Sequence, residues 1–88
     1  MRPEELKSLL RRQPFVPLRF HITDGRTYDI RHPDQVIVLK GAVDIGVNPD
    51  PRSGIVEQVE RCSLFHLVRV EEMPLAPSTS QTNGAASA

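Results

Sequence analysis

The sequence predicts one small, mainly β domain of the α+β class, with a short N-terminal helix followed by five or six antiparallel strands. Three observations lead to this prediction. Apolar and polar residues alternate along several short segments, and Gly- or Pro-containing turns separate those segments. A chain of 88 residues also holds at most one domain. We place that domain at residues 1–73.

Residues 3–12 are predicted to form the helix. Pro3 suits the first helical position, and the two glutamates after it lie where the helix dipole favours negative charge. Three leucines form a single apolar stripe, at positions Leu6, Leu9 and Leu10. Pro14 ends the pattern. Because so short a helix is not stable alone, we expect it to pack against the sheet.

Residues 18–31 predict a β-hairpin whose register follows from the sequence. A two-residue Asp-Gly loop would set Phe20 opposite Asp29, an apolar side chain against a charged one. A three-residue loop ending at Gly25 instead sets Phe20 opposite Tyr28, and Arg19 opposite Asp29 on the other face. Directly opposite residues share a face, so this register yields one apolar face and one charge-matched face. We therefore predict a bulged turn with Gly25 in the left-handed conformation.

Residues 36–47 predict a second hairpin, in which Val38 opposes Val43. Ile37 and Leu39 point to the opposite face of the first strand. That strand is therefore apolar on both faces, and we expect it to be covered by the helix or closed into a barrel.

The rest of the chain predicts a loop, two strands and a tail. Residues 48–54 form the loop, and residues 55–62 form a fifth strand that alternates imperfectly and is the expected sheet edge. Ser63 caps a single helical turn that leads into a closing strand at residues 67–70. Residues 74–88 carry no charge and no aromatic side chain, so we expect a disordered C-terminal tail.

This order of elements resembles that of SH3-like small barrels, including the Sm-like variety with its N-terminal helix. The resemblance implies an SH3-like or Sm-like small barrel or a strongly curled sheet; the alternative is an open antiparallel sheet with the helix across one face. Four segments also resemble a group of short, uncharacterised bacterial proteins: Leu10-Arg11-Arg12-Gln13-Pro14-Phe15 with Pro17, Thr23-Asp24-Gly25-Arg26, Arg31-His32-Pro33 and Ser63-Leu64-Phe65-His66-Leu67. This resemblance covers residues 3–72 and implies no known activity.

The sequence predicts no catalytic, cofactor or metal site. Cys62 and His66 are four residues apart, but no third group that would orient the imidazole is visible. We expect Cys62 to be a small buried apolar side chain. One cysteine and three widely spaced histidines do not match the ligand spacing of structural zinc. The glycines are isolated and do not form a phosphate-binding loop. We therefore expect a non-enzymatic domain.

Location is predicted from the single cysteine and from the distribution of apolar residues. No apolar run approaches the roughly 18 residues of a membrane-spanning helix, and the N-terminal residues contain no apolar signal region. One cysteine forms no internal disulfide, which is typical of a reducing compartment. We expect a cytoplasmic protein without membrane contact.

A protein-interaction or self-assembling module is the function that remains. A domain of this size has marginal stability, and exposed strand edges favour pairing with a protein partner or with a second copy. The formal net charge is +0, but residues 1–31 hold seven basic and four acidic side chains. The alternative function is therefore a weak RNA- or single-stranded-DNA-binding small barrel. Its contacts would be Arg11, Arg12, Arg19, Arg26 and Arg31.

Overall fold

The structure, a computed structural model, describes residues 1–73; the tail predicted at residues 74–88 lies outside the described residues. The elements follow in the order α1 (Pro3–Leu10), β1 (Leu18–Ile22), β2 (Thr27–Ile30), η1 (Pro33–Gln35), β3 (Val36–Val38), β4 (Ala42–Val47), β5 (Gln58–Ser63), η2 (Leu64–His66) and β6 (Leu67–Glu72). This confirms a mainly β fold with a short N-terminal helix and six antiparallel strands.

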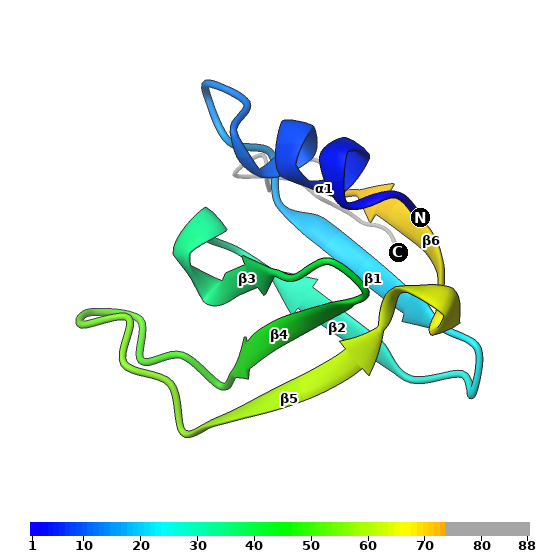
Figure 1. Cartoon of the computed structure of the whole chain (residues 1–88). Coiled ribbons are helices and arrows are strands. Elements are labelled where there is room, and N and C mark those ends of the chain that lie inside the picture. Colours follow the sequence, from blue (N-terminus) through cyan, green and yellow to red (C-terminus); the bar gives the residue numbers. More distant parts are fainter. Residues whose placement is uncertain (74–88) are drawn as a thin grey trace, which may run out of the picture.

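The strands form two three-stranded antiparallel sheets, in the orders β2-β1-β6 and β3-β4-β5. In Figure 1, β4 and β5 lie in front of β1 and β2, and α1 lies across the upper end of both layers. The short helical turn η2 leads the chain back to the first sheet, where β6 pairs with β1. The first and last strands are therefore neighbours. β5 is an edge strand, as predicted.

The first hairpin has the predicted register. Phe20 lies opposite Tyr28, and Arg19 lies opposite Asp29. The backbone N–H of Ile22 donates to the carbonyl of Arg26 at 2.9 Å, which closes a three-residue loop. Gly25 has a φ of +91°, so its predicted left-handed conformation is confirmed.

Phe20 lies at the centre of the core and has no exposed surface. Its neighbours in the first sheet are Tyr28 on β2 and Val70 on β6. Ile45 of the second sheet and Leu6 of α1 belong to the same buried cluster and are fully covered. Side chains from both sheets and from the helix thus share one core, and the predicted packing of the helix on the sheet is confirmed.

The prediction that the strand at residues 36–39 is covered on both faces is wrong. The second hairpin has its predicted register, with Val38 opposite Val43, but the side chain of Ile37 is 60% exposed. The physical reason is the position of α1. Its leucines insert into the core at the end of the two sheets and leave the outer face of β3 uncovered.

The fifth strand begins at Gln58, three residues later than predicted. The residues before it close the preceding loop, since the carbonyl of Ile55 accepts from the N–H of Asp50 at 2.9 Å. Val56 packs on the outer face of β4 at Gly46, where an added Cβ would come within 2.6 Å of the Val56 Cγ1. These β-branched residues therefore serve the loop rather than the β4–β5 ladder.

The turn geometry predicts that Gly25→Ala lowers the free energy of unfolding by about 1–2 kcal/mol. The added Cβ meets nothing within 4 Å, so the cost is one of backbone conformation alone. Thermal and urea unfolding measure the change. Gly41→Ala is the matched control, because Gly41 is also surrounded by open space but does not have a positive φ. Equal stabilities of the two variants would contradict the assignment.

Candidate functional site

Four of the five arginines predicted as nucleic-acid contacts are in ion pairs with carboxylates. The pairs are Arg12–Glu72, Arg19–Asp29, Arg26–Asp24 and Arg31–Asp29, at 2.5, 2.7, 2.8 and 3.8 Å. Within the described residues, Arg11 makes no such pair. The five side chains come from four parts of the fold, namely the segment after α1, strand β1, the turn of the first hairpin and the segment that follows β2. The structure does not bring them together as one unopposed basic surface, and the nucleic-acid alternative stays a prediction.

The outer face of the first sheet is a network of charged side chains. Arg19 donates two hydrogen bonds to Asp29, at 2.7 and 3.2 Å, and lies opposite Glu71 on its other side. His21 shares a 2.9 Å hydrogen bond with Glu71 and contacts Arg69. The hydrogen bond from Arg19 lowers the pKa of Asp29, and that from His21 lowers the pKa of Glu71. The charged side chains of this face pair with one another, as is typical of a surface exposed to solvent.

Cys62 is a free thiol with 5% exposure, which confirms that it is a buried side chain. His66 bonds through Nδ1 to the hydroxyl of Thr23 at 3.3 Å, so its partner is not the cysteine. Across residues 1–73, no group of three or more His, Cys, Asp or Glu side chains is arranged to hold a metal ion.

Tyr28 links the two sheets through its hydroxyl group. The O–H donates to the carboxylate of Glu60 on β5, and the guanidinium of Arg26 donates to the same hydroxyl at 2.9 Å. Burial, together with the hydrogen bond to Glu60, raises the pKa of Tyr28. The hydroxyl therefore stays protonated and acts as a donor between the edges of the two sheets. It is not suited to act as a base or a nucleophile.

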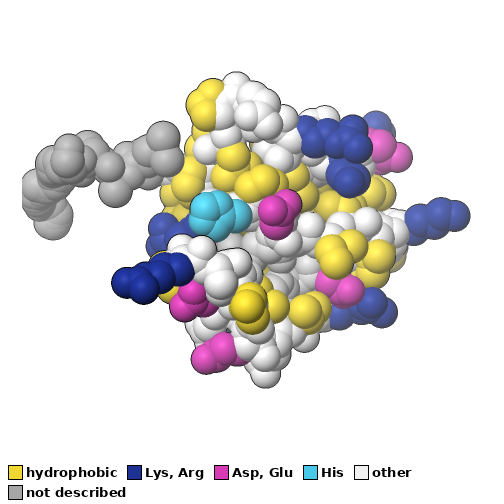
Figure 2. Space-filling view, turned by 90° about the vertical axis from the view of Figure 1, so that its left-hand side faces the viewer, with side chains coloured by type: hydrophobic (Ala, Val, Ile, Leu, Met, Phe, Trp, Pro, Cys, Tyr) yellow, Lys and Arg dark blue, Asp and Glu magenta, His cyan; other side chains and the backbone are white. Residues whose placement is uncertain are grey.

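A hollow of about 580 Å³ opens between β2, η1 and the loop at residues 48–54. The side chain of Gln35 crosses it at the base. Its Nε2 donates to the carbonyls of Asp29 and Gly46 at 3.0 and 2.9 Å, and its Oε1 accepts from the N–H of Arg31. Figure 2 shows basic, acidic and hydrophobic side chains interspersed on this side of the molecule. The polar groups at the base are already used by the fold.

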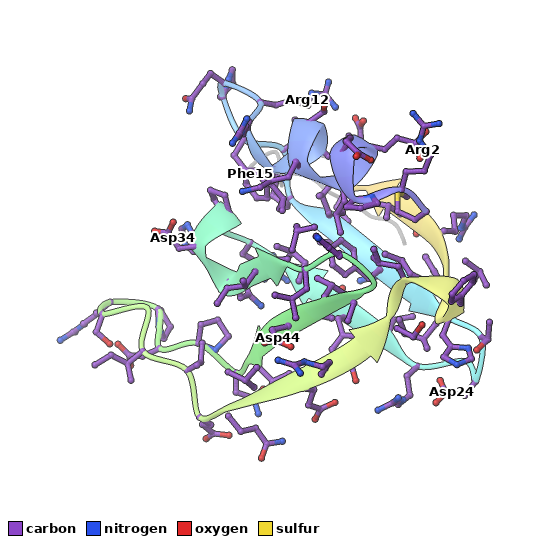
Figure 3. All side chains as sticks on the ribbon, viewed as in Figure 1. Arg2, Arg12, Phe15, Asp24, Asp34 and Asp44 are labelled. Atoms are coloured by element: carbon purple, nitrogen blue, oxygen red, sulfur yellow. The ribbon has the colours of Figure 1, made fainter. Side chains whose placement is uncertain are left out.

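The outer face of the second sheet exposes aliphatic side chains. Ile37 is 60% exposed and Val59 is 58% exposed. Beside them, Asp44, which is opposite Ile37, is also directly opposite Arg61 and forms an ion pair with it at 2.6 Å. Asp44 projects from the near side of β4 in Figure 3. The outer face of the second sheet therefore combines one ion pair with exposed aliphatic side chains.

Two more exposed apolar side chains lie around η2. Phe65 is 92% exposed, and its N–H donates to the hydroxyl of Ser63, which confirms the predicted cap. Val68 is the extra residue of a bulge in β6. Ile22 of β1 pairs with Leu67, and His21 pairs with Arg69, so Val68 has no partner on β1. Its side chain is 60% exposed.

A groove between α1 and β3 was not predicted from the sequence. It consists of two hollows of about 500 and 380 Å³, which adjoin because Lys7, Arg11 and Val38 line both. Lys40 lies at the end nearest the β3–β4 turn, and Asp34 lies at the η1 end. Figure 1 shows α1 directly above β3. About 30 residues separate the two walls in the chain, so no local sequence pattern indicates the groove.

Comparison with known proteins found no matching family model, no matching curated protein and no matching solved structure. The resemblance to a group of bacterial proteins therefore stays a prediction. In the part of the chain that the structure describes, no helix has the length and apolar character needed to cross a membrane.

The environment of Tyr28 predicts a change in stability at high pH. Its folded-state pKa is raised above the ordinary value of 10.0. The stabilisation is therefore fully present below about pH 10 and is lost as the pH rises towards the folded-state pKa. Tyr28 is the only tyrosine and the chain has no tryptophan, so ultraviolet absorbance follows this ionisation directly. A titration in the folded protein at the ordinary pKa would contradict the expected hydrogen bond.

The variant Tyr28→Phe isolates the contribution of the hydroxyl group. We expect its free energy of unfolding at neutral pH to be about 1 kcal/mol lower, because Glu60 loses a hydrogen-bond donor. Above pH 10 the variant should lose less stability than the wild-type protein. Urea unfolding of both proteins across this pH range measures the difference.

Proposed function

We propose that residues 1–73 form a non-enzymatic protein-interaction module that binds another polypeptide chain. The partner is a separate protein or a second copy of this chain. The observation that carries this proposal is the contrast between the outer faces of the two sheets. One face pairs its charges, whereas the other exposes aliphatic side chains.

The exposed apolar side chains favour contact with a partner. Ile37 and Val59 are more than half exposed on the second sheet, and Phe65 is almost fully exposed at η2. Burying an aliphatic side chain of this size contributes about 1.5–3 kcal/mol. On the outer face of the first sheet, Arg19, Asp29 and Glu71 form ion pairs and hydrogen bonds, and the exposed aliphatic side chain of that sheet, Val68, lies at the bulge of β6. The second sheet is therefore the better docking surface.

The chemistry of the remaining groups supports binding rather than catalysis. Cys62 is buried, and Tyr28 is a protonated donor between the sheets. We keep the cytoplasm as the proposed location, because a single buried thiol suits a reducing compartment. We do not carry the nucleic-acid alternative further, since carboxylates oppose four of the five arginines on which it depends.

The test combines two measurements on the full chain. Sedimentation velocity over a wide concentration range detects self-association, and selection from a random-peptide display library detects binding to other chains. We expect concentration-dependent association or the enrichment of a defined peptide pattern. The double variant Ile37→Lys/Val59→Lys should weaken that binding about fivefold or more, since it places charges in an apolar contact.

The matched control is Ile55→Lys, which changes an exposed aliphatic side chain on the loop before β5. We expect it to leave binding unchanged. A constant monomer mass together with no enriched peptide would overturn the proposal. An equal loss of binding in Ile55→Lys would show that the second sheet is not the contact surface.

A further inference from the structure

We infer that the groove between α1 and β3 binds an extended acidic segment of the partner polypeptide, which adds as a strand to the free edge of β3. This inference rests on the proposed protein-interaction function and names its site and its class of partner. Three features support it: the unpaired edge of β3, the obstruction of the other edges, and the cations that line the groove.

The backbone of β3 has a free side that faces the groove. β3 pairs with β4 alone. The N–H of Leu39 donates to the carbonyl of Ala42 at 2.9 Å, so the backbone groups of Leu39 face β4. Backbone groups alternate in direction along a strand, and those of Val38 therefore face away from β4. Figure 1 shows α1 on the side of β3 away from β4, and Val38 lines the groove, so an extended peptide in the groove would meet unpaired donors and acceptors.

Each of the other three edges is obstructed. On β2, the carbonyl of Asp29 already accepts from Gln35. The hydrogen bond between Tyr28 and Glu60 ties β2 to β5, so a strand inserted between these edges would break it. On β6, the bulge at Val68 interrupts the regular pairing pattern. Within residues 1–73, the edge of β3 has no strand partner and no side-chain bond to another strand, although α1 contacts β3 at the groove. It is therefore the best available site for strand addition.

The groove holds cations that the rest of the domain leaves unopposed. Lys7, Arg11 and Lys40 line it, and none forms an ion pair with any residue that the structure describes. By contrast, the arginines of β1, β5 and β6 are all paired. Two carboxylates line the groove near its ends, Glu4 on α1 and Asp34 on η1, and Figure 3 shows Asp34 at the η1 end. The middle of the groove is therefore positive, which favours an acidic segment.

The side chains that line the groove also indicate which residue types the bound peptide segment should carry. Alternate side chains of an added strand point to opposite faces of the sheet. On the inner face they would meet Lys7 and Arg11, and on the outer face they would lie beside the exposed Ile37. A segment that alternates acidic and aliphatic residues fits both sides. The aliphatic surface of the second sheet thus continues into the groove through Ile37.

The test uses a fluorescein-labelled hexapeptide with capped ends that alternates glutamate and valine. We expect fluorescence anisotropy to show binding that weakens with salt, and no binding of a hexapeptide that alternates lysine and valine. Lys7→Glu and Lys40→Glu should each weaken binding about fivefold or more. Arg52→Glu is the matched control, because Arg52 is an exposed cation of the loop at residues 48–54 that does not line the groove and makes no ion pair with the described residues. It should change binding less than about twofold, and circular dichroism verifies that all three variants stay folded.

Strand addition has a readout that charge attraction alone does not produce. The amide of Val38 should exchange more slowly with solvent when the peptide is bound, as followed by NMR. A peptide methylated on the backbone nitrogens of alternate residues should bind more weakly, because it lacks donors for the edge of β3. Binding with no protection of Val38 and no effect of methylation would overturn strand addition.

The outcomes distinguish the groove from the wider function. If display selection yields peptides that bind normally to Lys7→Glu and Lys40→Glu, the groove assignment fails while the protein-interaction function stands. If no peptide binds and the chain stays monomeric, both fail. Both the groove assignment and the protein-interaction function are supported if the glutamate–valine hexapeptide binds, if Lys7→Glu and Lys40→Glu weaken that binding, and if the amide of Val38 exchanges more slowly in the complex.

Discussion

The burial of Phe20 at the middle of β1 is the constraint on which the rest of the structure depends. Its side chain lies between Tyr28 and Val70 of the two neighbouring strands and has no exposed surface. A slip of one residue would move this apolar row to the solvent and carry the charged row, headed by Arg19, into the core. The bulged turn at Gly25 prevents that slip. The positions of β6 and of α1 follow, since β6 extends the same apolar row through Val70 and α1 helps to cover it.

The outer faces of the two sheets differ in the charge pattern of their side chains. In the first sheet, acidic and basic side chains alternate across the strands, so that Arg19 is flanked by Asp29 and Glu71. In the second sheet, a single pair, Asp44–Arg61, is set among aliphatic side chains. On the first surface, the charged side chains already have hydrogen-bond and ion-pair partners within the sheet. The second surface gains more from a partner, because its aliphatic groups remain hydrated otherwise.

The groove is a consequence of how α1 packs. Leu6 and Leu10 insert into the core at the end of the two sheets, which places the helix beside the edge of β3 rather than over its outer face. The same orientation directs the basic residues of α1 towards that edge. The position of α1 thus leaves Ile37 exposed, leaves one edge of β3 without a strand partner, and brings Lys7 and Lys40 to the same groove. The proposed binding mode uses all three results.

The sequence by itself determined the helix, both hairpin registers, the bulged turn and the cap at Ser63, because alternation, turn chemistry and capping act between residues that are close in the chain. Only the tertiary structure decided which helix or strand packs against each face of the sheets. The pairs Arg12–Glu72 and Tyr28–Glu60 join residues 60 and 32 positions apart, and nothing local indicates them. Residues 55 and 56 have strand-forming side chains, yet loop closure and packing on Gly46 took precedence. The groove likewise depends on long-range packing, since its two walls come together only when the leucines of the helix are buried.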